Sequence, residues 1–197
     1  DLTMFPFLAI FITFCIILGY YIKKGDSSQK EVMDGFFEKE RLSNEVRKKD
    51  ISQLNYITIP FEKIPYSIDT QTEKNFFSFA EKTMVNFNGI SNTELKLQYG
   101  TANLSILSEY DANYMDMITL LPIYVDELLE AGQLETAQLL LEFAVDTKAD
   151  SRKIYTQLIS IYKETNQYDK FDHLMTTSNE LPETTKTIIQ KDLSAIL

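Results

Sequence analysis

An apolar pattern that recurs after 34 residues is the strongest constraint on how the C-terminal part of this chain can fold. At that shift the large apolar side chains of two segments coincide: Leu121 with Tyr155, Tyr124 with Leu158, Leu128 with Tyr162, and Leu134 with Tyr168. The dipeptides Gly132–Gln133 and Asn166–Gln167 coincide as well. Glycine, and after it asparagine, best tolerates a left-handed backbone, so both dipeptides are expected to form the same turn. The pattern predicts two successive helical hairpins.

The two segments resemble tetratricopeptide repeats over about Ile118–Glu183. In that family, large apolar residues mark the first helix, a glycine marks the turn, and small residues mark the close approach of the second helix. The first unit has, in this order, Leu121, Tyr124, Leu128, Gly132, Leu134, Ala137, Leu141 and Ala144. The second has Tyr155, Leu158, Tyr162, Asn166, Tyr168, Phe171, Met175 and Ser178. Phe171 and Ser178 stand where the family has alanine, so the second unit departs from the pattern.

The resemblance implies helix pairs at residues 118–150 and 152–182, followed by a terminal helix at 183–197. It also implies that the first helix of each pair lines a concave wall that binds a partner protein. The residues expected on this wall are Thr119, Ile123, Asp126, Glu130, Lys153, Thr156, Gln157 and Ser160. Two units cannot bury their own faces, so the helices of Thr72–Met117 are expected to complete the core without following the repeat pattern. The alternative is an irregular helical domain that contains one accidental hairpin.

The remainder of the domain at residues 67–197 is also expected to be helical, which makes the fold class all-α. Helical spacing of apolar residues predicts a helix at Thr72–Phe87, and the segment Ala102–Gly132 is expected to be helical in two pieces because of Pro122. Residues 51–66 contain Pro60 and Pro65, which exclude a helix. Since no other segment offers a partner strand, these residues are predicted to form an extended strap on the helical domain.

The run Leu2–Ile22 carries no charged residue. At about 1.5 Å per residue, its length in a helix matches the roughly 30 Å of a bilayer's hydrocarbon core. It predicts a transmembrane anchor at residues 1–22, with a juxtamembrane helix at 23–50. Lys23 and Lys24 follow the run directly, so the positive-inside rule places the N-terminus outside and the C-terminal domain in the cytoplasm. The opposite orientation is the alternative.

Charge and composition exclude several classes of function. Ser91–Leu197 contains eight Lys/Arg against seventeen Asp/Glu, a net charge of −9, and nucleic-acid binding requires a basic surface instead. The chain has one cysteine, Cys15, and one histidine, His173, too few for a thiolate or histidine zinc site. No catalytic, cofactor-binding or metal-binding residue is predicted, and no cofactor.

Together these features predict a cell-membrane protein, anchored by a single helix, that binds one or more partner proteins through a helical-repeat domain and is not an enzyme. The first alternative is an accessory structural subunit or assembly factor of a larger membrane complex, with the anchor packed against other subunits. The second is an irregular helical domain with an unrelated role.

Overall fold

The computed structural model describes the backbone of residues 4–195 and the side chains of residues 10–24 and 29–195. Eight α-helices form most of this part of the chain, which confirms the all-α prediction. The chain divides into two compact units. Unit 1 consists of Asp1–Lys49 and Asn92–Ala102, and unit 2 of Asp50–Ser91 and Asn103–Leu197.

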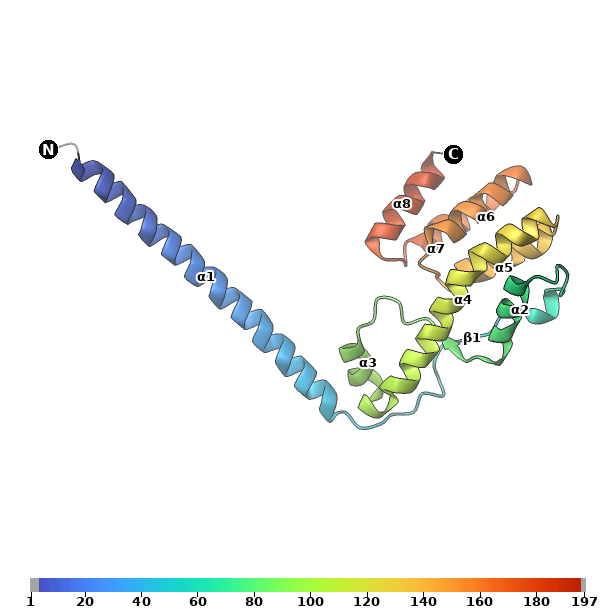
Figure 1. Ribbon diagram of the computed structural model, residues 1–197, viewed down its shortest axis with the longest axis horizontal. Helices are drawn as coiled ribbons and strands as arrows, with labels where there is room; N and C mark the ends of the chain where they lie inside the picture. The colour runs from blue at the N-terminus through green and yellow to red at the C-terminus, as the bar shows by residue number, and fades with distance from the viewer. Residues whose placement is uncertain (1–3, 196–197) are drawn as a thin grey trace. The chain divides into compact units, whose positions relative to one another are not determined.

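Helix α1 (Met4–Glu45) is the main element of unit 1 (Figure 1). The helix predicted at residues 23–50 is its second half and ends at Glu45. No proline interrupts the chain between Pro6 and Pro60, and Pro6 lies in the first turn, where no helical N–H is needed. None of the helices, over the residues that the structure describes, is long and apolar enough to cross a membrane. Residues 1–3, where the predicted anchor begins, lie outside the described part.

Helix α3 (Asn92–Tyr99) packs on the C-terminal end of α1. Glu40 is at the centre of this contact, because its carboxylate pairs with Lys96 and accepts a 2.6 Å hydrogen bond from Thr93. The Lys96 ammonium and the Thr93 hydroxyl lower the pKa of Glu40. Gly100 follows with a φ of +86°, and a Cβ atom there would lie 2.3 Å from the carbonyl oxygen of Arg47. Only glycine fits this close approach.

Unit 2 begins with the predicted strap, which does have a partner strand. Strand β1 (Tyr56–Ile57) pairs antiparallel with β2 (Met84–Val85), in the register Tyr56 with Val85 and Ile57 with Met84. The expectation that no segment pairs with the strap is therefore wrong. Beyond β1, Ile59 and Ile64 are buried in the core on either side of the 3₁₀ helix η1 (Phe61–Lys63).

The helix predicted at Thr72–Phe87 is shorter than expected. Helix α2 (Gln71–Phe77) gives way to the 3₁₀ helix η2 (Ser78–Glu81), and the next residues extend into β2. Met84 and Val85, which fitted the helical spacing, are instead buried as a strand. A short apolar run can satisfy either period, and here the pairing with β1 decides between them.

A fully buried carboxylate, that of Glu73, joins three segments of unit 2. Its oxygens accept hydrogen bonds from the backbone N–H groups of Ser67, Ile68 and Asp69 at 2.9, 3.1 and 2.7 Å. They also accept one from the hydroxyl of Tyr124 at 2.9 Å. Burial and the neighbouring carboxylate raise the pKa of Tyr124, so its hydroxyl keeps the proton that it donates. These hydrogen bonds hold together the loop at residues 67–69, helix α2, and the long helix that contains Tyr124.

That long helix, α4 (Leu104–Glu130), starts a repeat-like succession of antiparallel helices. It is followed by α5 (Leu134–Asp146), α6 (Arg152–Glu164), the 3₁₀ helix η4 (Tyr168–Lys170), α7 (Phe171–Ser178) and α8 (Glu183–Ser194). Figure 1 shows α8, α6, α4 with α5, and α2 as neighbours across the unit. The shared core contains the predicted apolar positions Leu121, Tyr124, Leu128, Ala137, Leu141, Ala144, Tyr155, Leu158 and Tyr162.

The two repeat turns have the same hydrogen bonds. Gly132 has a φ of +74° and Asn166 a φ of +59°. The N–H of Gln133 donates to the carbonyl of Leu128, and the N–H of Gln167 to the carbonyl of Tyr162, both at 2.8 Å. This is the six-to-one bond of a Schellman motif in each case. The prediction of one shared turn conformation is confirmed.

Two details differ from the sequence-based expectations. Helix α4 is continuous through Pro122, so its predicted division into two pieces is wrong. Burial of both halves, including Tyr114 and Tyr124, compensates for the hydrogen bond that proline cannot donate. Tyr168, expected in the core by analogy with Leu134, is 49% exposed. It lies in the 3₁₀ turn before α7, and Phe171 fills the core in its place.

The buried carboxylate can be tested by the substitution Glu73→Gln. The amide keeps the shape but directs an N–H₂ group at backbone donors, so it leaves buried groups unsatisfied. We expect a loss of about 2–3 kcal/mol in the free energy of unfolding, measured by urea denaturation with circular dichroism. Glu81→Gln, an exposed change of the same type on η2, is the control and should cost less than about 0.5 kcal/mol. Equal effects of both substitutions would contradict this role.

Candidate functional site: a cleft between α4 and α2–η2

The predicted partner-binding residues lie on two neighbouring helices. Thr119, Ile123, Asp126 and Glu130 project from α4 at intervals of three or four residues, so they share one face of that helix. Lys153, Thr156, Gln157 and Ser160 project from α6. The four α4 residues are exposed, and Ile123 is an aliphatic side chain with 49% of its surface open to solvent.

The structure brings three of these eight residues into contact. Lys153 Nζ lies 2.7 Å from the Asp126 carboxylate, and Gln157 Nε2 donates to the same carboxylate at 2.6 Å. Gln157 Nε2 also donates to the carbonyl of Pro122 at 3.0 Å. The amide oxygen of Gln157 is buried and accepts no hydrogen bond from the described residues. These bonds set the spacing of α4 and α6.

The three hydroxyl groups among the predicted residues do not join the helices. Thr119, Thr156 and Ser160 each donate to a carbonyl three or four residues earlier in their own helix, at 2.8 to 3.0 Å. Glu130 forms no hydrogen bond or ion pair with any residue that the structure describes. Among the described residues, the exposed face of α4 therefore keeps one hydroxyl oxygen that can accept, that of Thr119, and one unpaired carboxylate, that of Glu130.

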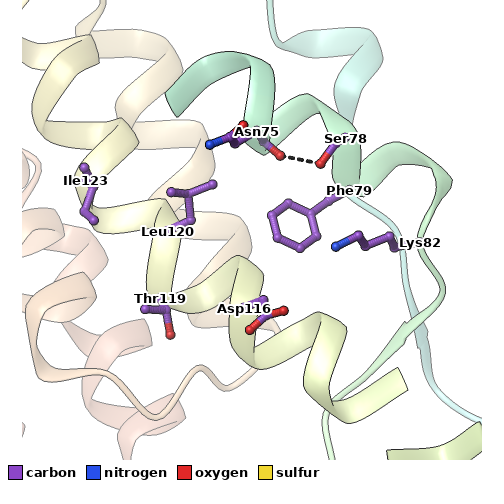
Figure 2. Close-up of a pocket in the computed structure, with 8 residues that line it drawn as sticks. All are labelled: Asn75, Ser78, Phe79, Lys82, Asp116, Thr119, Leu120 and Ile123. Carbon is purple, nitrogen blue, oxygen red and sulfur yellow. Dashed lines mark hydrogen bonds between the residues drawn. The ribbon is translucent and has the colours of Figure 1, made fainter. Parts of the chain in front are cut away.

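A cleft of about 370 Å³ opens beside this face, between α4 and the segment α2–η2 (Figure 2). From α4 it is lined by Asp116, Thr119, Leu120 and Ile123, and from the other side by Asn75, Ser78, Phe79 and Lys82. Figure 2 shows the Phe79 ring and the Lys82 chain facing α4 across the opening. Thr119 and Ile123 thus belong both to the predicted wall and to the cleft.

Sequence reasoning missed the α2–η2 side of the cleft. The repeat pattern fails upstream of Leu121, so no register placed these residues opposite α4. The available signal was the run of three phenylalanines Phe76, Phe77 and Phe79, which is more apolar surface than one short amphipathic helix buries. Phe76 is fully buried against Tyr124, with ring centroids 5.0 Å apart, and Phe79 forms the wall of the cleft.

Helix α4 makes the electrostatic potential beside the cleft negative, because it contains six carboxylates and no lysine or arginine. Three of the six are satisfied within unit 2: Asp111 by the N–H of Phe87, Asp126 by Lys153, and Glu127 by the hydroxyls of Thr70 and Thr72. Glu109, Asp116 and Glu130 have no hydrogen bond or ion pair among the described residues. The cation nearest the cleft, Lys82, lies with Nζ 4.6 Å from the centroid of the Phe79 ring.

A second hollow, of about 380 Å³, lies over α5, α6 and α7 and is lined by two ion pairs, Lys170 with Glu142 and His173 with Asp146. Burial raises the pKa of Glu142, but hydrogen bonds from Lys170, Gln138 and Tyr162 lower it overall. Nearby, His173 Nε2 lies 2.9 Å from the carboxylate of Asp146, and both side chains are exposed. These groups link one helix to the next, and the described residues contain no group of three metal-ligating side chains.

Known proteins offer no relative of this chain from which a function for the cleft could be taken. No protein-family model, no curated protein and no solved structure matches the chain.

The link between α4 and α6 can be tested through Gln157. Replacement by methionine keeps the length of the side chain but removes two hydrogen bonds, so we expect a loss of about 1 kcal/mol in the free energy of unfolding. Urea denaturation measures this change. Ser160→Ala, which removes only a bond within α6, is the control and should cost less than about 0.5 kcal/mol. A Gln157→Met variant as stable as the parent would show that the bridge is dispensable.

Proposed function

We propose that this protein is a membrane-tethered scaffold or adaptor that binds a partner protein in a groove, by which we mean the cleft between α4 and α2–η2 together with the adjoining exposed face of α4. The observation that carries the proposal is the cleft at Ile123, where exposed apolar surface adjoins unpaired polar groups. Protein interfaces combine an apolar centre with a polar rim in this way. We also propose that the chain itself carries out no catalysis.

Tetratricopeptide-like architecture supports this role. The two helix pairs share their turn bonds, and the first helix of each pair carries the residues expected on the concave wall. We propose that α4–α5 and α6–α7 are degenerate tetratricopeptide-like units closed by α8. Stacked helix pairs of this kind form extended binding surfaces, since neighbouring first helices lie side by side.

The tether is the second part of the proposal and rests on the sequence. Leu2–Ile22 is uncharged and is followed at once by Lys23 and Lys24. We propose that this run is inserted in the cell membrane with the domain on the cytoplasmic side. The described apolar side chains between Ile10 and Ile22 are exposed, as a lipid-facing helix requires.

Partner binding can be tested with a photoreactive amino acid at position 123. We expect irradiation of intact membranes to give a discrete protein adduct through this position, seen as a shifted band and identified by mass spectrometry. Position 168 is the matched control, because Ile123 and Tyr168 are both 49% exposed but Tyr168 lies outside the groove. Adducts of equal yield at both positions, or none at position 123, would refute the groove as the binding site.

Membrane insertion can be tested by placing charges in the apolar run. We expect the pair Ile12→Lys and Ile16→Lys to release the protein from carbonate-washed membranes, since each lysine in a bilayer costs about 2.5–3.5 kcal/mol. The pair Ile12→Leu and Ile16→Leu is the control and should remain bound. If the lysine variant stays in the membrane fraction, Leu2–Ile22 is not the anchor.

The alternative role, an accessory subunit of a membrane complex, is favoured by one feature of unit 1. Val32, Met33, Phe36 and Phe37 form an apolar patch on α1, each more than half exposed. Exchange of residues 2–22 for an unrelated apolar helix distinguishes the two roles. A tether keeps its adduct at position 123 after this exchange, whereas a subunit held by specific helix contacts loses its place in the complex.

A further inference from the structure

The cleft between α4 and α2–η2 has two walls of opposite hydrogen-bonding character. On the α2–η2 side, the Lys82 ammonium and the side-chain amide nitrogen of Asn75 are hydrogen-bond donors. The Ser78 hydroxyl donates to the backbone carbonyl of Asn75 at 2.6 Å (Figure 2). On the α4 side, the Asp116 carboxylate is an exposed acceptor without a partner among the described residues. A ligand that fits both walls presents acceptors to one and a donor to the other.

Three of the side chains that line the cleft are apolar. Phe79 is almost fully buried, Leu120 is half-buried, and Ile123 is half exposed at the edge. The volume of about 370 Å³ lies near the lower end of the range for ligand pockets, roughly 300–1,000 Å³. This space suits one or two large apolar side chains, and the open mouth lets the chain that carries them continue along α4.

The negative charge of α4 favours a positively charged ligand. With six carboxylates and no cation on the helix, the field along its exposed side is negative, and the unpaired Asp116 and Glu130 lie at the two ends of the exposed face. The one cation at the cleft, Lys82, rests on the Phe79 ring and belongs to the opposite wall. A ligand cation beside Asp116 therefore gains attraction, while backbone carbonyls of a peptide match Lys82 and Asn75.

We propose that the cleft binds a basic peptide segment of the partner, with an aliphatic or aromatic side chain on Phe79, Leu120 and Ile123 and a neighbouring Lys or Arg on Asp116. This inference rests on the proposed function and specifies the chemistry of its partner. The peptide lies across α4 with its carbonyl groups toward α2–η2. An acidic or purely apolar segment is disfavoured because it leaves Asp116 desolvated and unpaired.

The test uses the full chain in nanodiscs of zwitterionic phosphatidylcholine, which gives basic peptides no anionic lipid to bind. Selection from phage-displayed random dodecapeptides should enrich sequences with a large apolar residue next to Lys or Arg. The most enriched peptide, labelled with fluorescein, is then titrated by fluorescence anisotropy. Asp116→Asn and Ile123→Ser should each weaken binding about three- to tenfold, and added salt should reduce the effect of Asp116→Asn.

The matched control is Glu109→Gln, which removes the same charge from α4 at a position outside the cleft, and it should change the affinity less than twofold. Circular dichroism verifies that each variant is folded. Enrichment of acidic or uncharged peptides, no enrichment at all, or equal affinity for Asp116→Asn and the parent would overturn the inference. Preferential binding of a second copy of the chain, seen as dimers that Ile123→Ser dissolves, would also overturn it.

The outcome is separable from that of the proposed function. If the adduct at position 123 forms in native membranes but is insensitive to Asp116→Asn, a partner binds in the groove and its basic character is refuted. If basic peptides bind as expected but no adduct forms in membranes, the preference of the cleft for basic peptides is supported and the scaffold role is refuted.

Discussion

The arrangement of unit 2 depends on the carboxylate of Glu73. It lies where the loop before α2, α2 itself and α4 meet, and it is the group through which all three are bonded to one another. A buried charge is costly unless its lone pairs are satisfied, and here three backbone N–H groups and a tyrosine hydroxyl satisfy it. The loop residue Asp69 has a φ of +49°, in the left-handed region that aspartate adopts more readily than most residues other than glycine. The bond from its N–H to Glu73 holds the loop in this conformation.

This constraint also builds the cleft, because Asn75, Ser78 and Phe79 follow Glu73 on the same short segment. Two further contacts hold that segment to α4. Glu127 accepts hydrogen bonds from Thr70 and Thr72 at 2.6 and 2.5 Å, and the rings of Phe76 and Tyr124 pack together. A helix of seven residues has little stability of its own, so its position is set by these tertiary contacts. The position of this cleft wall is therefore set by its contacts with α4.

The sequence predicted those parts of the fold that are encoded over short distances. The turns at Gly132 and Asn166 need a residue with a left-handed backbone conformation, and glycine and asparagine at these positions make this need recognisable in the sequence. Pairing of β1 with β2 was not predictable in the same way, because each strand contributes two residues and the partners are 27 or more positions apart. The exposed Tyr168 shows the limit of the repeat analogy, since a one-turn 3₁₀ segment rotated it out of the register that Leu134 keeps.

The candidate site divides along the same line. Residues on α4 and α6 were expected from the resemblance to tetratricopeptide repeats, whereas the opposing wall depends on a long-range contact that no local pattern encodes. The distribution of charge on α4 bears on both parts of the site, the α4 face and the opposing α2–η2 wall. Six like charges on one helix repel, and unit 2 relieves this repulsion only in part, with Lys153, hydroxyl groups and a backbone N–H. The carboxylates left unpaired are exposed, and Asp116 lies beside apolar side chains at the cleft. The proposed peptide matches this surface because its cation would pair with the Asp116 carboxylate and its apolar side chain would cover the exposed apolar area beside it.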